Sequence, residues 1–223
     1  MLSVNCPNCG AEVVFRSPAL PVKVCDYCRT AVTRIDDGVR AAGEMAVLPF
    51  DVSPIRIGTR GSFDGQMFDV IGRVRWGWSD GAWNEWLLLF ADGRDAWLGE
   101  AMGQFMLLFE KPLEGSLARV VSRLAKGGDA TIGDKAMIDG IDYQVADIKD
   151  AACIACEGEL PFTAPAGWKV KSVDFRSNIG ACASFQHDGT EASLYTGRYV
   201  TLAELHPQDL RALDGWTIPS FAA

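Results

Sequence analysis

A duplicated segment constrains the fold of this chain more than any other feature of its sequence. Residues 57–70 (IGTRGSFDGQMFDV) align without a gap with residues 132–145 (IGDKAMIDGIDYQV). Ile, Gly, Asp, Gly and Val coincide in the two runs, and the basic and aromatic positions match in kind. In both copies an Asp-Gly pair separates two stretches with apolar alternation, which is the signature of a β-hairpin. We therefore predict two copies of one small β module.

Turn residues divide the first copy into short strand candidates with hairpin spacing. Five short strands with Gly- or Asp-rich turns favour a half-open barrel over a βαβ unit. The candidates are Ile55–Arg60, Gln66–Trp76, Glu85–Phe90, Arg94–Leu98 and Gln104–Phe109. Short helices are expected at Val39–Met45 and Leu117–Leu124.

Four cysteines near the N-terminus have the spacing of a metal-binding ribbon. They form two Cys-x-x-Cys pairs, Cys6 with Cys9 and Cys25 with Cys28. Two such pairs place four thiolates around one structural Zn²⁺, with no open position for a catalytic water. The alternative is two disulfides, which a reducing cytosol disfavours. We predict a zinc ribbon on a short tether, stabilised by its metal.

The predicted fold class is mainly β: an N-terminal zinc ribbon followed by two tandem antiparallel β modules, small half-open barrels related by the internal repeat. The expected boundaries are 1–34 for the zinc ribbon, 35–54 for a linker, 55–112 for the first module, 113–126 for a second linker, 127–205 for the second module and 206–223 for a C-terminal tail.

Composition narrows the function classes. The 223 residues carry 21 Lys and Arg against 29 Asp and Glu, a formal net charge of −8, so a general nucleic-acid binder with a basic face is disfavoured. No run of about 18 apolar residues appears, and the N-terminus lacks a signal-peptide pattern. We therefore expect a cytoplasmic protein without membrane insertion.

Five of the seven tryptophans gather between Trp76 and Trp97. Aromatic rings can cage an ammonium group by cation–π attraction, but such rings also fill cores. Core packing is the expectation for Trp76, Trp86 and Trp97. A binding site for a cationic ligand or a partner is expected at the turn that carries Trp78, Trp83, Asp80 and Glu85.

A second thiol group comprises Cys153, Cys156 and Cys182. Residues three apart on a strand point to opposite faces, which argues against a shared metal. Buried structural thiols are the main expectation. A second metal site with His187 and a redox pair are the alternatives.

Four further carboxylates are candidate site residues: Glu157, Glu159, Asp174 and Glu191. Paired carboxylates can perform acid–base chemistry when they meet in a cleft. Glu157 and Glu159 share a strand face that could bind Ca²⁺ or Mg²⁺ weakly. A solvated acidic surface is the default expectation.

The order of several motifs resembles a bacterial family catalogued as domain of unknown function 4178. The motifs are the two Cys-x-x-Cys pairs, the repeat, Trp83–Leu88, Glu157–Pro161 and Tyr195–Tyr199. The resemblance implies a cytoplasmic zinc-ribbon protein whose gene neighbours those of polyamine-synthase-like enzymes and small membrane proteins. It therefore implies a stress- or envelope-linked system, and it assigns no chemistry to any residue.

Together these features predict a zinc-binding accessory or adaptor protein of a bacterial multi-protein system, which recognises a protein partner or a cationic ligand such as a polyamine. The alternative is an enzyme that acts on a polyamine-like or other cationic substrate through acidic groove residues. A nucleic-acid regulator is the third alternative. It requires a basic face, for which Arg73, Arg75, Lys169, Lys171 and Arg176 are the only candidates, and acidic residues are interleaved with them.

Overall fold

The chain is built almost entirely from antiparallel strands in the computed structural model, which describes residues 1–36, 38–115 and 117–222. The elements are β1 (Leu2–Asn5), β2 (Glu12–Phe15), β3 (Val22–Val24), β4 (Thr30–Ile35), β5 (Gly38–Glu44), β6 (Arg60–Phe63), β7 (Gln66–Trp78), β8 (Gly81–Phe90), β9 (Asp95–Ala101), β10 (Gln104–Lys111), α1 (Arg119–Leu124), β11 (Lys135–Ile138), β12 (Ile141–Leu160), β13 (Lys169–Arg176), β14 (Ala181–His187), β15 (Ala192–Val200) and the 3₁₀ turns Ala203–Leu205 and Ser220–Ala222. The mainly β fold class is confirmed. The described residues contain no helix with the length and apolar character needed to cross a membrane.

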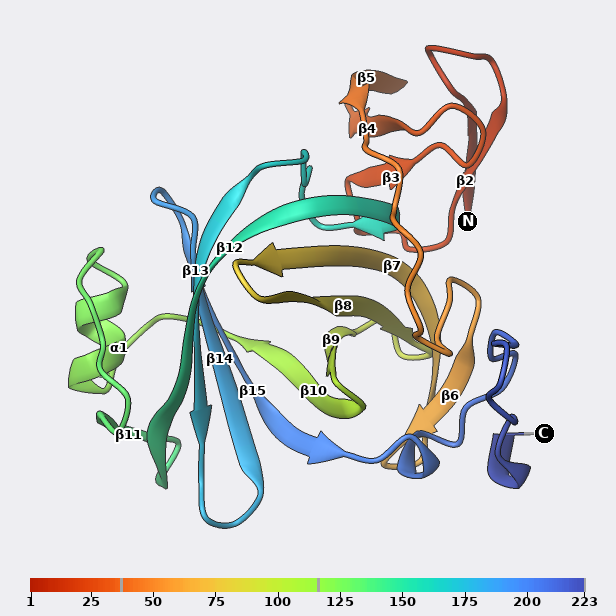
Figure 1. Cartoon of the computed structure of the whole chain (residues 1–223). Helices are drawn as coiled ribbons and strands as arrows, with labels where there is room; N and C mark the ends of the chain where they lie inside the picture. Colours follow the sequence, from red (N-terminus) through yellow and green to blue (C-terminus); the bar gives the residue numbers. More distant parts are fainter. Residues whose placement is uncertain (37, 116, 223) are drawn as a thin grey trace.

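Two four-stranded meanders form one ring of strands (Figure 1). The first runs through β7, β8, β9 and β10, and the second through β12, β13, β14 and β15. Their edges pair twice, β10 with β15 from Phe105↔Val200 to Lys111↔Leu194, and β7 with β12 from Gly77↔Ala152 to Gly72↔Gly158. Each predicted module is thus half of the ring, and each half completes the other.

The internal repeat is visible in matching hydrogen bonds. β6 and β11 begin at equivalent positions of the two copies and form the first hairpin of each. Gly58 N–H donates to Val70 O at 2.8 Å, and Gly133 N–H donates to Val145 O at 2.9 Å. Both glycines have φ of 91°, a left-handed conformation that disfavours side chains. The two copies therefore fold by the same local interactions.

Some local expectations were wrong. The first strand of the repeat is β6, not Ile55–Arg60, because the residues before it form a turn that Gly58 completes. Val39–Met45 is not a helix: β5 occupies most of it, pairing with β4 from Ile35↔Gly38 to Thr30↔Glu44. Hydrogen bonding to β4 therefore outweighs the helical preference of this segment, which lies within the expected linker 35–54. The expected second helix is α1, which starts two residues later than predicted.

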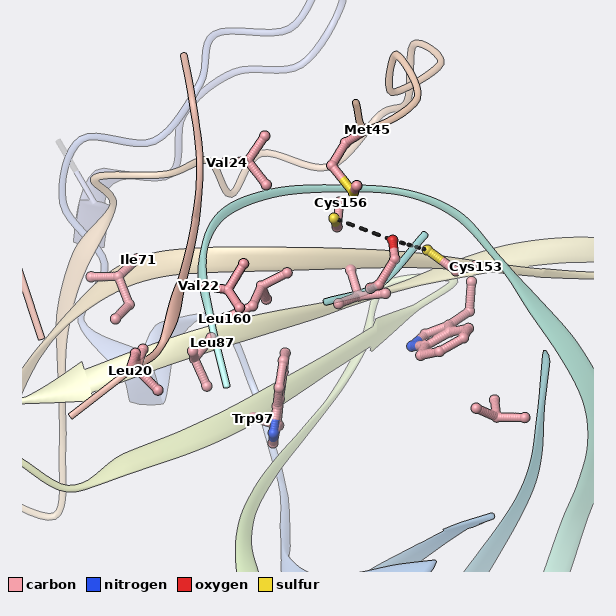
Figure 2. Packing of buried hydrophobic residues seen from close by; sticks show 14 of the residues in the cluster. Leu20, Val22, Val24, Met45, Ile71, Leu87, Trp97, Cys153, Cys156 and Leu160 are labelled. Atoms are coloured by element: carbon pink, nitrogen blue, oxygen red, sulfur yellow. Dashed lines mark hydrogen bonds between the residues drawn. The ribbon is translucent and has the colours of Figure 1, made fainter. Parts of the chain in front are cut away.

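Three hydrophobic clusters pack against the ring. The first lies on its inner side and extends to the ribbon, as Figure 2 shows around Leu20, Val22, Leu87, Cys156 and Leu160. The second lies outside the first half, where β6 and residues of the C-terminal tail such as Leu210 cover it. α1 and β11 cover the third, outside the second half. Both halves thus bury apolar residues on their outer faces, while their inner faces carry polar positions beside the first cluster.

The N-terminal ribbon is joined to the ring rather than tethered to it. β3 extends the sheet at the end of β12 through the pairs Leu160↔Val22 and Glu159↔Lys23. The Glu159 side chain, with 1% of the residue exposed, accepts the backbone N–H groups of Arg16 at 2.7 Å and Ser17 at 2.9 Å. A buried carboxylate needs such donors. The expectation of a ribbon on a short tether is therefore wrong.

Glycines permit the close approach of the two seams. A Cβ on Gly197 would lie 1.9 Å from Leu107 O, and one on Gly72 would lie 1.9 Å from Glu159 O. Real Cβ atoms do not come this close to backbone, so these positions require glycine. Gly99, on the neighbouring strand β9, differs because its nearest neighbour would be the flexible end of Met106 at 3.6 Å.

Replacing Gly197 by Ala tests ring closure at the β10–β15 seam. The added methyl group forces the strands apart, so we expect the free energy of unfolding to fall by about 3 kcal/mol or more, at the upper end of overpacking costs. Gly99→Ala is the matched control and should change it by less than about 1 kcal/mol. The measurement is urea unfolding followed by circular dichroism. Equal effects of the two substitutions would contradict the described seam.

Candidate functional site

The interior of the ring contains a cavity of about 530 Å³. Every one of the eight ring strands contributes to its lining, from Trp78 of β7 to Tyr199 of β15. Such breadth places the cavity inside the ring rather than on its surface. We call it the central cavity.

Aromatic rings form much of its wall. Trp78, Trp83, Trp97, Phe162 and Tyr195 line the central cavity. Trp78 and Trp83 have ring centroids 5.6 Å apart, and Trp97 stacks on Phe162 at 5.9 Å with an interplanar angle of 19°. The π faces of such rings attract cations, and Lys149 Nζ already lies 5.7 Å from the centroid of the Trp78 ring.

Glu85 lies on the same wall with three neutral donors. Its carboxylate accepts the indole N–H groups of Trp76 at 2.7 Å and Trp83 at 3.1 Å, and the Gln186 amide at 2.6 Å. Burial raises the pKa of Glu85 above its ordinary value, and the three donors partly offset that effect. Glu85 lies deep in the protein. Its side chain is nevertheless only partly buried, because it borders the cavity.

Asp174, from the second half of the ring, is a second carboxylate in the central cavity. Burial raises its pKa to about 6, and the hydroxyl of Ser184 opposes that shift by hydrogen bonding. The charge of Asp174 also raises the pKa of Glu85, so the two carboxylates interact electrostatically across the ring. A like charge nearby disfavours ionisation of both groups.

Among the other charged side chains of the cavity, Lys149 and Asp147 form an ion pair, whereas Arg176 and Glu100 contact neutral groups. Lys149 Nζ lies 2.7 Å from Asp147 Oδ1, and Arg176 Nε donates to Tyr199 Oη at 2.7 Å. Glu100 accepts from Ser53, Asn84 and Trp86 at 2.6–3.1 Å. No ion pair involves Glu85 or Asp174 in the part of the chain that the structure describes. Two buried carboxylates beside aromatic rings, without an ion-pair partner, suit a cationic guest.

The structure brings together three of the four residues expected at the tryptophan turn. Trp78, Trp83 and Glu85 line the central cavity, whereas Asp80 is exposed at the hairpin tip and accepts a hydrogen bond from Ser79 at 2.7 Å. Trp76 and Trp86 are fully buried, and Trp97 is 7% exposed. Trp97 therefore belongs to the core and to the cavity wall.

The four N-terminal cysteines lie close together. The Sγ atoms of Cys6 and Cys28 are 3.6 Å apart, those of Cys9 and Cys25 are 3.8 Å apart, and all four fall within 4.8 Å of one another. Four sulfurs at the zinc–sulfur bond length of about 2.3 Å stand about 3.8 Å apart in a tetrahedron. The donor set and spacing therefore fit a metal ion.

Two equivalent turns hold these thiols. Gly10 N–H donates to Cys6 O and Arg29 N–H donates to Cys25 O, each at 2.9 Å, and both donors have positive φ. The hydroxyl and backbone N–H of Thr30 lower the pKa of Cys28 to about 6, whereas the pKa of Cys9 in the same cluster is raised to about 12. In the described residues, this is the only group of three or more Cys, His, Asp or Glu that could hold a metal.

The second thiol group lies in the core. Cys153, Cys156 and Cys182 are buried, and burial raises their pKa values to about 12, 11 and 12. The thiols of Cys153 and Cys156 both donate to Ala164 O, at 3.3 and 3.4 Å (Figure 2). The expectation that they point to opposite faces was wrong, because a register shift between Cys153 and Ala155 interrupts the alternation.

The four carboxylates considered as one group do not meet. Glu159 anchors the ribbon, and Glu157 pairs with Arg73 at 3.4 Å. Asp174 faces the central cavity, and Glu191 is exposed beside the β14–β15 turn.

Sequence reasoning missed the cavity role of Asp174. The signal lies in β13 and β14, where Ser172, Asp174, Ser184 and Gln186 alternate with apolar residues. In these strands the apolar face packs outward, under α1 and β11, and the polar face lines the interior. Only the three-dimensional arrangement tells which face is inside.

The comparisons with known proteins show the family to which this chain belongs. No curated protein and no solved structure matches the chain. The family described as Domain of unknown function (DUF4178) matches residues 56–202, which include the whole ring. The chain therefore belongs to this family.

Proposed function

We propose that this protein binds a small organic cation in the central cavity. The observation that carries the proposal is the pair Glu85 and Asp174, two buried carboxylates that face an aromatic cavity without ion-pair partners. A volume of about 530 Å³ lies in the range of small-molecule sites, which is about 300–1,000 Å³. Closed rings of eight strands are either filled by side chains or wide enough to hold one small ligand.

Each part of the cavity suits one part of such a guest. An ammonium group would add a positive charge near Glu85 and near Asp174, whose pKa Arg176 and Lys149 already lower in part. The indoles of Trp78 and Trp83 would cover its alkyl groups. A cation–π contact contributes about 0.5–2 kcal/mol, more where water is excluded. The lining contains no cysteine or histidine among the described residues, so a thiolate or imidazole nucleophile is not part of the proposed site.

An enzyme with a cationic substrate is the second candidate. The observation that favours it is the pKa of Asp174 near 6, which suits a general acid or base at neutral pH. Mass spectrometry of each bound amine after incubation distinguishes the two: an unchanged mass supports binding alone.

The N-terminal cysteines complete the proposal as a structural zinc site. Four thiolates fill the tetrahedral coordination of Zn²⁺ and leave no open position, so the metal would stabilise the ribbon rather than react. The adaptor role and the protein partner stay predictions, and the firm attachment of β3 to β12 favours a structural use of the ribbon.

Removal of the metal should loosen the ribbon and lower the stability of the ring with it. We expect chelation, or Cys25→Ser, to lower the thermal unfolding midpoint, because β3 and the Glu159 anchor depend on the folded ribbon. Metal analysis should find one Zn²⁺ per chain, and added Zn²⁺ but not Ca²⁺ should restore the midpoint. An unchanged midpoint in the metal-free protein contradicts this role.

Cation binding should depend on charge and on Asp174. We expect choline and spermidine to change tryptophan fluorescence, since three indoles line the cavity. The uncharged analogue 3,3-dimethylbutanol should bind at least about tenfold more weakly, a difference of about 1.4 kcal/mol. Asp174→Asn should weaken choline binding by a similar factor.

The control is Asp142→Asn, an exposed position on β12 outside the cavity lining. It should leave the affinity unchanged. Asp174→Asn should not reduce the free energy of unfolding at pH 7, because Asn keeps the Ser184 contact and removes a buried charge. Asp142→Asn should not reduce it either, because Asp142 is exposed. If no probe alters the fluorescence at millimolar concentration, the cation-binding proposal fails.

A further inference from the structure

A larger hollow adjoins the central cavity at each end of the ring. The first, about 930 Å³, shares Trp97, Phe162, Gln186 and Tyr195 with it and adjoins residues 161–168 and the turn 188–191. We call this hollow the loop-side vestibule. The second, about 1100 Å³, shares Trp83, Met102, Arg176 and other residues, and the C-terminal tail borders it. We call it the tail-side groove.

The two hollows lie at opposite ends because the strands cross the ring. β13 begins near the loop-side vestibule, which Val170 lines, and ends near the tail-side groove, which Arg176 lines. β15 likewise runs from Ser193 to Val200 between the same two hollows. The central cavity therefore has two candidate routes of entry, one from each hollow.

Charge distinguishes these two routes. Four carboxylates and one guanidinium line the loop-side vestibule: Asp95, Glu110, Asp188, Glu191 and Arg94. The tail-side groove has Arg75 and Arg176 beside Asp51, Glu100 and Asp214, and Asp51 is itself paired with three arginines. A mouth with one sign of charge and low-dielectric walls concentrates ions of opposite sign. The vestibule therefore attracts cations more strongly than the groove does.

Phe162 stands between the vestibule and the central cavity, since it lines both. Its ring stacks on Trp97 and meets the edge of Trp168 at a centroid distance of 5.2 Å. It is half-buried, and it belongs to the loop between β12 and β13 rather than to a strand. Rotation of this one side chain would change the opening between the two spaces.

The far part of that loop is firmly held. Gly167 N–H donates to Cys153 O and Cys153 N–H donates to Trp168 O, both at 2.8 Å. Ala164 is 1% exposed and its carbonyl accepts the thiols of Cys153 and Cys156. This anchorage assigns a structural use to the core thiols: they fix the base of the loop that carries Phe162.

We propose that cations reach the central cavity through the loop-side vestibule, with the Phe162 side chain as the gate. The proposal rests on the proposed cation-binding function and adds the route and the device that control access. Its test measures access directly, so it remains informative even if no tight-binding ligand is found.

The test places a reporter thiol in the cavity by Met106→Cys. Met106 is half-buried, lines the central cavity and makes none of the contacts of Glu85 or Asp174. The zinc-loaded protein is treated with two methanethiosulfonates of similar size, one bearing a trimethylammonium group and one a sulfonate. The thiolate attacks the sulfur, a mixed disulfide forms and methanesulfinate leaves. Mass spectrometry of peptides follows the reaction at position 106, with the unsubstituted protein as background.

We expect the cationic reagent to react at least about tenfold faster than the anionic one at low salt, with a ratio that falls as salt screens the vestibule. Asp95→Asn with Glu110→Gln should slow the cationic reagent about three- to tenfold. The matched control, Asp142→Asn with Glu114→Gln, removes the same charge from exposed positions outside the cavities and should have no effect.

Asp214→Asn separates the two routes, because this exposed carboxylate lines the tail-side groove but neither the central cavity nor the vestibule. If it slows the cationic reagent while the vestibule pair has no effect, cations enter through the tail-side groove and the proposal is overturned. Phe162→Ala should accelerate both reagents, because a gate obstructs either charge. Unchanged rates in Phe162→Ala exclude the gate. Thermal unfolding of each variant confirms that the ring is intact.

Discussion

Closure of the strand ring is the interaction on which the remaining structure depends. Two identical topological halves pair along β7–β12 and β10–β15, which leaves no unpaired edge within the ring. Free edges of a sheet invite aggregation, and mutual pairing removes that hazard. Gly72 and Gly197 allow the backbones to approach at the two seams. The interior exists only because of this closure: Glu85 comes from one half and Asp174 from the other.

In this account the ribbon contributes stability, and the ring provides the binding site. The four thiols fix the ribbon, the ribbon extends β12, and Glu159 fastens the two parts. Within the ring, by contrast, Glu85 and Asp174 oppose folding at neutral pH, since burial raises the pKa of each. Buried charges that bind a ligand commonly lower the free energy of unfolding of the ligand-free protein. A cationic guest would remove that cost, so the ligand would stabilise the fold.

The sequence was informative where local chemistry decides the structure. The repeat, the Asp-Gly turns and the cysteine pairs each report a local geometry, and the structure shows all three. Ring closure depends on pairing between residues far apart in the sequence, such as Gly72 with Gly158 and Phe105 with Val200, which no single-sequence pattern encodes. For the same reason β5 escaped prediction. The bulge at Cys153 also depends on its partner strand, so the alternation rule failed there. Trp78, Trp83 and Glu85 were identified by their clustering, whereas Asp174 joined them only through the fold.

The most direct test of the account is the proton balance of cation binding. Asp174, with a pKa of about 6, is largely protonated at pH 5 and ionised at pH 8, and Glu85 beside it shifts in the same direction. Lys149 and Arg176 oppose that shift at Asp174, and Asp147 reinforces it. A bound cation favours the ionised carboxylates, so binding below the pKa must release a proton. Calorimetric titration of choline in two buffers of different ionisation enthalpy measures that release. The account predicts proton release near pH 6, little at pH 8 and an affinity that rises between those values. Equal affinity at both pH values, with no proton exchanged, would contradict the claim that two unpaired buried carboxylates form the site.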